Sequence, residues 1–174
     1  MELEKIGIGA FKPLTGFMTK KDFYSVVNKM RLSNGKLFPL PVILPILNSE
    51  VEKINQATKI HLFFKNIEVA MMTPKSIFKP DFKKIIKLLF GTEDTNHPGY
   101  KMLVSSGEYF VGGPIKFIKK VKNNYSLFEI SPEEVKKNIK ILGLRYVAGF
   151  QTRNVPHKAH EHILHLALQE VDGV

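Results

Sequence analysis

Apolar residues recur at helical spacing in three segments of the chain. In the first segment, Thr19 precedes Asp22 by three residues, a pattern typical of a capping box at a helix start. Apolar positions then fall at i, i+3, i+4 and i+7, namely Phe23, Val26, Val27 and Met30. The pattern predicts one amphipathic helix whose apolar face packs on a core.

The other two helical segments carry start and stop signals of their own. Pro80 opens the segment DFKKIIKLLFG, and Gly91 is placed to end it in a left-handed cap. In the third segment, Ser131, Pro132 and Glu134 supply an N-cap, a first-turn proline and a capping-box partner. The inward-facing positions predicted for these two helices are Phe82, Ile85, Ile86, Leu89 and Phe90, followed by Val135, Ile139 and Leu142.

Short runs rich in strand-forming residues separate these helices. The runs are LPVILPIL (40–47), KIHLFF (59–64), IEVAMM (67–72), KMLVSS (101–106) and EYFVGGPIKFIKKV (108–121). Turn signals SNG, HPGY and GGP punctuate them, and the GGP at residue 112 is interpreted as a turn. Residues 1–130 are therefore predicted to form a β-rich domain with two helices. Pro41 and Pro45 indicate that residues 40–47 form an edge strand or a bent one.

The pattern changes after residue 131. LRYVAGF (144–150) is a nearly unbroken apolar run, typical of a strand buried in a parallel sheet. QTRNVPH follows it and leads into an amphipathic segment, KAHEHILHLALQEVDG. Residues 131–174 are therefore predicted to begin a second domain with one strand-loop-helix unit. The fold class is α/β, or α+β over the whole chain.

Composition limits the classes of partner that this protein can have but does not identify one of them. The formal net charge of +10 favours phosphate, sulfate, nucleic acid or an anionic surface as partner, but the lysines are scattered, as on a solvated surface. The absence of cysteine excludes disulfides and thiolate metal sites, which fits a reducing compartment. No apolar run approaches the length that spans a bilayer. We expect a cytoplasmic protein that does not associate with membranes.

The segment QTRNVPHKAHE carries the candidate chemistry. A loop that leads from a parallel strand into a helix presents backbone N–H groups and the positive helix end, which bind anions. Asn154 is the predicted N-cap, and His157 and His160 fall on one face of the first turns. Arg153 offers a planar fork of donors suited to a tetrahedral oxyanion, and Gln151 adds amide donors.

A metal site is the competing interpretation of these histidines. The segment HEHILH does not match the H-E-x-x-H pattern, because Leu164 occupies the place of the second histidine. His160 and His165 diverge by ~140° around a helix. We therefore predict no protein-bound metal.

The sequence resembles the ATP sulfurylase (sulfate adenylyltransferase) family. QTRNVPHKAHE is similar to that family's Q-x-R-N-P-x-H-x-x-H motif. GAFKPLTGFM, MRLSNGKLFPLPV, FGTEDTNHPGY and YFVGGPIKFI resemble the family's N-terminal segments in the same order. The resemblance implies a PUA-like domain over residues 1–130 and the start of a Rossmann-like nucleotidyltransferase domain over residues 131–174.

The resemblance also implies an activity and residue roles. A nucleotidyltransferase of this family converts ATP and sulfate into adenosine 5′-phosphosulfate and pyrophosphate in sulfate assimilation, with Mg²⁺ accompanying the ATP. Gln151 and Arg153 match the sulfate-binding positions. Thr152, Arg153, Asn154, His157 and His160 match catalytic positions, and the positions that match nucleotide contacts are Gln151, Asn154, His157 and His160.

The sequence departs from the family pattern in three ways. Val155 stands where the motif has its first proline, and Pro156 follows one place later. In members of the family, a further segment usually precedes the part that matches the start of this chain. The family's catalytic domain also continues beyond the part that matches residue 174. The resemblance thus implies a fragment truncated at both ends that is inactive alone. It would pair with a chain supplying the rest of the catalytic domain, or form a homo-oligomer.

Two noncatalytic alternatives remain open. A basic PUA-like module could hold RNA through its positive surface. Nucleic acid is nevertheless not the expected partner, because the phenylalanines mostly occupy core-like positions and no RNP-like aromatic motif is present. The other alternative is a structural subunit that completes a second sulfurylase chain, in which Arg153 would not matter.

Overall fold

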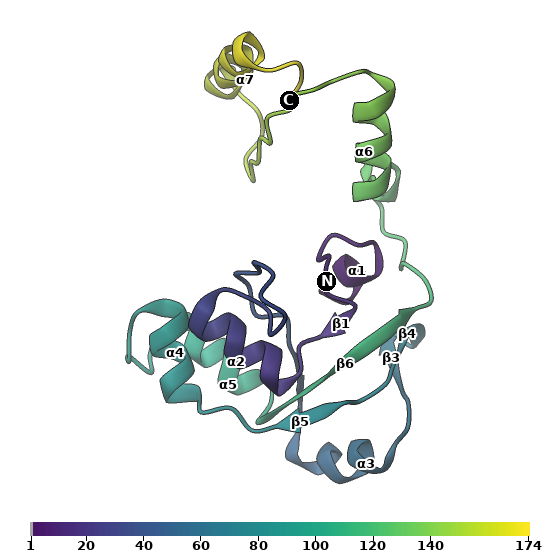
Figure 1. The fold of residues 1–174 in the computed structure, drawn as a ribbon, viewed down its shortest axis with the longest axis vertical. Coiled ribbons are helices and arrows are strands. Elements are labelled where there is room, and N and C mark those ends of the chain that lie inside the picture. Colours follow the sequence, from purple (N-terminus) through teal and green to yellow (C-terminus); the bar gives the residue numbers. More distant parts are fainter. Residues whose placement is uncertain (1) are drawn as a thin grey trace. The chain divides into compact units, whose positions relative to one another are not determined.

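The structure is a computed structural model that describes residues 2–174. The chain divides into two compact units, Met1–Leu127 and Phe128–Val174 (Figure 1). The mixed helix and strand content confirms the predicted α+β class.

The first unit contains most of the regular structure. Its helices are α1 (Glu2–Gly7), α2 (Lys20–Lys29), the 3₁₀ helix η1 (Asn48–Glu50), α3 (Val51–Gln56), α4 (Phe82–Phe90) and α5 (Pro98–Ser106). Its strands are β1 (Gly16–Phe17), β2 (Leu44–Ile46), β3 (Ile60–Phe64), β4 (Ile67–Met72), β5 (Ser76–Phe78) and β6 (Tyr109–Phe117). A second 3₁₀ helix, η2 (Ser126–Phe128), lies at the junction of the units.

Strand β6 is the centre of the six-stranded antiparallel sheet (Figure 1). Its first half pairs with β2 and β5, and its second half pairs with β1 and β4. β3 completes the sheet by pairing with β4. β6 thus pairs directly with four of the other five strands.

The glycines of the GGP segment lie within β6, so the interpretation of this segment as a turn is wrong. A Cβ at Gly112 would stand 2.1 Å from the Met18 carbonyl oxygen, and one at Gly113 would stand 2.1 Å from the Thr73 carbonyl oxygen. Neighbouring backbone therefore approaches β6 too closely for a side chain at either position. The two glycines lie where the neighbours of β6 change from β2 and β5 to β1 and β4.

Helices α2 and α4 confirm two of the predicted helical segments. Thr19 caps α2 by accepting a hydrogen bond from the Asp22 N–H, and Asp81 caps α4 in the same way through the Lys84 N–H. Gly91 ends α4 in the left-handed conformation, as predicted. Met30 was predicted to face the core, but it forms the left-handed C-cap of α2 and is 62% exposed.

The core of the first unit is an apolar cluster between the sheet and helices α2 and α4. Phe23 of α2, Phe78 of β5 and Phe110 of β6 meet ring to ring at centroid distances of 5.5–5.7 Å. Phe110 also meets Phe82 of α4 edge-on at 6.0 Å. Such pairs add to the free energy gained by burying their area. The aromatic cluster fixes both helices against the sheet.

The prediction of a strand at KMLVSS is wrong, because residues 98–106 form helix α5. The HPGY segment is its first turn, with Pro98 at the first helical position and the His97 side chain accepting from the Gly99 N–H. The prediction also missed α1 and α3, which are only six residues long. The first unit accordingly holds more helices than the two expected.

The second unit contains α6 (Pro132–Ile141) and α7 (Lys158–Glu170). The predicted capping box of α6 forms between Ser131 and Glu134. Its predicted inward face does not become buried: Leu142 is 69% exposed and Val135 is 38% exposed. In residues 128–174, all of which the structure describes, no apolar side chain is fully buried.

The segment LRYVAGF does not form the predicted extended strand. It makes a single parallel bridge between Val147 and Gly173. Beside the bridge, the Ala148 N–H donates to the Gly173 carbonyl and the Asp172 N–H donates to the Tyr146 carbonyl, each at 2.9 Å. The residues around 147 therefore pair with the segment after α7, and the apolar run lacks the further parallel neighbours that would extend it.

Candidate functional site

The loop between the Val147 bridge and α7 begins with a local turn. Thr152 Oγ1 accepts the Asn154 N–H at 3.0 Å and lies 3.4 Å from the Asn154 carbonyl oxygen. A threonine side chain that bonds the backbone two residues on stabilises such a turn without help from other elements. Thr152 and Asn154 are thus brought together, with Arg153 between them on the exposed outside.

His157, and not Asn154, is the N-cap of α7. The helix begins at Lys158, and His157 has extended backbone angles. Its Nδ1 accepts the Ala159 N–H at 3.3 Å, which satisfies one of the backbone donors left unpaired at a helix start. The prediction that Asn154 caps this helix is therefore wrong by three residues, because the Thr152 turn and Pro156 keep residues 152–156 outside it.

His157 and His160 form a reciprocal pair at this helix start. While His157 caps the helix, His160 Nδ1 accepts the His157 N–H at 3.2 Å. The ring centroids of the two imidazoles lie 4.0 Å apart. The sequence spacing predicted that both would share one face of the first turns, and the structure brings them into contact.

The hydrogen bonds of these two histidines occupy the same ring atom in each residue. Each Nδ1 accepts a backbone N–H and so carries a lone pair. A neutral imidazole with a lone pair on Nδ1 carries its proton on Nε2. The neutral pair therefore offers two Nε2–H donors at the positive end of α7, where an anion is favoured.

Phe150 is a contributor to this site that the sequence reasoning missed. Its ring meets the His160 ring edge-on, with centroids 5.8 Å apart and planes at 74°. This contact restricts the His160 imidazole from a second ring besides that of His157. An aromatic residue directly before a polar loop was the available signal in the sequence.

Gln151 and Arg153 are exposed, and within residues 2–174 neither side chain has a hydrogen-bond or ion-pair partner. The acid in the first turn of α7, Glu161, lies 3.8 Å from His165 on the next turn. The guanidinium of Arg153 is thus not neutralised by a neighbouring carboxylate. The loop therefore presents N–H donors of Gln151 and Arg153 that have no partner within residues 2–174.

Asp172 holds the two ends of the loop-helix segment together and was also missed. Its Oδ2 accepts the N–H groups of Arg145 and Tyr146, each at 2.8 Å. The hydrogen bonds from Tyr146 and Arg145 hold the pKa of the Asp172 carboxyl below its ordinary value of 3.8. This carboxylate and the Val147–Gly173 bridge together fix where the loop starts and where α7 ends.

No group of three or more His, Cys, Asp or Glu side chains within residues 2–174 could hold a metal ion. No helix in the same range combines the length and the apolar character needed to cross a membrane.

Two family models match the chain, and together they cover most of it. Residues 1–120 match the model of a PUA-like domain. Residues 127–174, which include the loop and α7, match the model of ATP-sulfurylase.

Curated relatives match over the whole chain. Sulfate adenylyltransferases of Thermococcus onnurineus and Pyrococcus abyssi are each 36% identical to it and align with 100% of it. The sulfate adenylyltransferase of Symbiobacterium thermophilum is 37% identical over 99% of the chain. The chain spans about 45% of the length of these relatives.

A solved structure shares the fold. The hexameric APS kinase from Thiobacillus denitrificans superposes with a TM-score of 0.70 over 97% of this chain and 30% of that one, at 19% sequence identity. This likeness concerns the fold alone. Through residues 1–120 the chain belongs to the PUA-like domain family, and residues 127–174 are similar to ATP-sulfurylase.

Proposed function

We propose that this chain supplies part of a sulfate adenylyltransferase, with the loop and helix start at residues 151–160 as its contribution to the active site. The observation that carries the proposal is the His157–His160 pair, whose Nδ1 atoms are both occupied by backbone N–H groups. Both Nε2–H groups are therefore free to donate to phosphate oxygens. The 36% identity to sulfate adenylyltransferases over the whole chain supports it.

The proposed reaction needs donors more than it needs an acid or a base. A sulfate oxygen attacks the α-phosphorus of ATP, a new phosphorus–oxygen bond forms, and the bond between the α-phosphorus and the bridging oxygen breaks. The electron pair of that bond leaves with pyrophosphate. Catalysis then consists of aligning two mutually repelling anions and stabilising the charge that develops on the phosphate oxygens.

The residues divide into two proposed roles. Arg153 and Gln151 bind sulfate, since a guanidinium without a carboxylate partner offsets the charge of an oxyanion most effectively. His157 and His160 donate to nucleotide phosphate oxygens as charge builds on them. Thr152 and Asn154 hold the turn that sets the position of Arg153 between them. In the same proposal, the side chains of Asn154 and Gln151 also contact the nucleotide.

Mg²⁺ would enter this reaction with ATP. The loop presents N–H groups of imidazole and guanidinium, and its side-chain oxygens are the neutral ones of Gln151, Thr152 and Asn154, whereas Mg²⁺ is usually bound through one or two carboxylates. The described residues around the loop therefore do not fit a Mg²⁺ site. When bound with ATP, the ion would neutralise nucleotide phosphate charge.

We propose that residues 131–174 begin a nucleotidyltransferase domain that is completed by polypeptide outside these residues. The chain spans 45% of the length of the matched relatives. Large apolar side chains of the second unit are open to solvent, with Tyr146 at 70% and Val155 at 86% exposure. Apolar surface of this kind is what a completing part of a domain would cover.

Calorimetric titration tests the proposal. The 174-residue chain is titrated with MgATP and then with sulfate, beside a variant carrying Arg153→Ala and His160→Ala. Arg145→Ala is the matched control, because Arg145 is another exposed arginine of the second unit. We expect binding to be lost in the double variant and retained in the control.

Two results would count against this function. Equal affinities in all three proteins would show that the loop does not hold the anions. The absence of binding by any folded chain, with RNA bound in a salt-dependent manner instead, would favour a noncatalytic basic module.

A further inference from the structure

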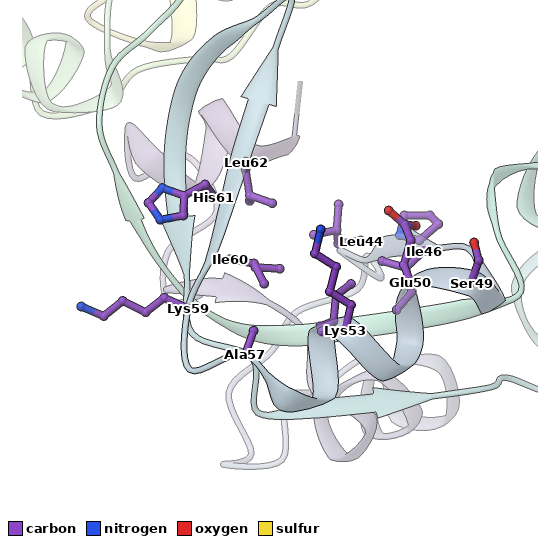
Figure 2. Close-up of a pocket in the computed structure, with 12 residues that line it drawn as sticks. Leu44, Ile46, Ser49, Glu50, Lys53, Ala57, Lys59, Ile60, His61 and Leu62 are labelled. Carbon is purple, nitrogen blue, oxygen red and sulfur yellow. The ribbon is translucent and has the colours of Figure 1, made fainter.

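Two adjoining cavities lie between strands β2 and β3 of the first unit. Their volumes are about 550 Å³ and 740 Å³, and both are lined by Leu44, Pro45, His61 and Leu62. Because they share these residues, they form one groove, which we call the β2–β3 groove. Figure 2 shows the end beside α3, where Ile60 and Leu62 of β3 lie across from Leu44 of β2.

The two strands that border the groove each have one unused edge. β3 pairs with β4 alone, and β2 pairs with β6 alone. Among the backbone hydrogen bonds of residues 2–174, none joins the other edge of either strand to a further segment. Alternate N–H and C=O groups along such an edge are free to pair with an added strand.

The groove is lined by apolar side chains and by several lysines. Leu44, Leu62 and Phe117 contribute apolar surface, and Phe63 and Phe64 of the β3–β4 hairpin are 62% and 53% exposed. Six lysines line the groove against three glutamates. The lysines are Lys53, Lys59, Lys65, Lys119, Lys120 and Lys122.

The glutamates of the groove are already engaged. Glu50 Oε2 accepts the Leu47 N–H at 2.8 Å, and Glu4 lies 3.3 Å from Lys120. Lys53 has no ion-pair partner within residues 2–174, and its side chain extends from α3 into the space between Leu62 and Leu44 (Figure 2). The groove therefore has an excess of positive charge beside its apolar wall.

We propose that the β2–β3 groove binds an extended acidic segment of another protein, which adds to the free edge of β3 as a further strand. In an extended segment, alternate side chains share a face, so one face can carry apolar residues that pack on Leu44 and Leu62 and an acidic residue that meets Lys53 between them (Figure 2). Opposite charge across the groove favours this partner over a second copy of a chain with a net charge of +10.

The unused strand edge distinguishes a peptide from a nucleic acid. A peptide backbone can continue the ladder of β3, whereas a nucleic acid would use the lysines and the exposed Phe63 and Phe64 and leave the ladder unpaired. This binding site lies in the first unit and is independent of the proposed sulfate adenylyltransferase function.

The test uses a fluorescein-labelled peptide that repeats Glu-Glu-Val-Val, so that each face of the extended peptide carries both residue types. It is titrated with the 174-residue chain and followed by fluorescence anisotropy. One control peptide replaces the glutamates with lysines, and another replaces alternate residues with proline, which removes backbone donors. We expect the glutamate peptide alone to bind, more weakly as salt is raised.

Charge reversal at Lys53 locates the binding on the protein. We expect Lys53→Glu to weaken binding by about tenfold or more. Lys83→Glu, an exposed lysine on helix α4 outside the groove lining, is the matched control and should leave the affinity unchanged. Hydrogen exchange gives a second measurement on the unmutated chain, in which the bound peptide should slow exchange at residues 60–64.

Several results would overturn the inference. Equal binding of the proline peptide, or no change in exchange at residues 60–64, would show that no strand is added. Binding of an oligouridylate in place of the peptide would assign the groove to nucleic acid. A dimer that dissociates on Lys53→Glu would assign it to a second copy of the chain.

Discussion

The double role of His157, as helix cap and as proposed phosphate donor, can be separated by two substitutions. Its Nδ1 accepts the Ala159 N–H at 3.3 Å, and its Nε2–H remains for a ligand. Asparagine is among the best N-cap residues, and its side-chain oxygen can accept the same N–H. His157→Asn therefore removes the donor of the imidazole and keeps the cap, whereas His157→Ala removes both.

The two effects have different sizes and different readouts. Loss of an N-cap acceptor costs about 1 kcal/mol of helix stability, and only His157→Ala should show this. Loss of a hydrogen bond to a charged phosphate costs about 1.5–3 kcal/mol, and both variants should show this. The second value corresponds to roughly 10- to 150-fold in the dissociation constant.

Circular dichroism and calorimetry measure the two effects on the same samples. Circular dichroism with urea reports the helix, and titration with MgATP reports the affinity. His162→Ala is the control, since His162 is an exposed histidine of the same helix that neither caps it nor contacts the His157–His160 pair. MgATP affinity of His157→Asn equal to that of the unmutated chain would refute the donor role. Helix stability of His157→Ala equal to that of His157→Asn would refute the capping role.

Three further predictions concern stability. Phe110→Ala removes a side chain that is 1% exposed and should cost about 3–5 kcal/mol in urea unfolding, whereas Phe64→Ala, at 53% exposure, should stay within about 0.5 kcal/mol; similar losses would contradict the assigned core. Because the pKa of Asp172 is lowered in the folded chain, its contribution is present above pH 3.8 and is lost as the pH falls below that value through the folded pKa. Amide exchange at the two N–H groups it accepts should accelerate over that interval, and Asp172→Asn should abolish the pH dependence. Gly112→Ala places a Cβ 2.1 Å from a backbone oxygen and should destabilise by about 4 kcal/mol or more in thermal unfolding; Gly149→Ala, with no atom within 4 Å, should change stability by no more than about 0.5 kcal/mol.

Helices with local start and stop signals were predictable from the sequence. Thr19, Ser131 and Gly91 each form the cap that their sequence context indicated. Capping depends on hydrogen bonds within about four residues, so the sequence contains nearly all the information that decides it. Met30 was misplaced because the same left-handed cap that ends α2 turns its side chain away from the core.

Elements whose pairing depends on distant residues were not predictable in the same way. KMLVSS has strand-like composition, but the Pro98 start of α5 lies outside that window. LRYVAGF has the apolar composition of a buried strand. Among residues 2–174, however, it makes a single bridge, to Gly173. A strand needs neighbours to satisfy its backbone, and the sequence of the run itself does not specify them.

The local geometry of the candidate loop was predicted only in part. Spacing alone placed His157 and His160 on one face, and they meet at 4.0 Å. The sequence favoured Asn154 as N-cap because asparagine is a common cap and histidine is not. Phe150 and Asp172 were missed because their contacts, to the His160 ring and to the Tyr146 N–H, are side-chain details that no periodicity reports.

Asp172 and the Val147–Gly173 bridge form a clamp that holds the loop in position, and none of its contacts involves the residues of the loop itself. The clamp consists of backbone hydrogen bonds and one carboxylate, all outside residues 151–157. Substitutions within the loop can therefore change its ligand without changing its anchorage. Val155 and Pro156, a shift of one place for the proline, are a variation of this kind. A loop anchored in this way can acquire or lose specificity residue by residue while α7 keeps its place.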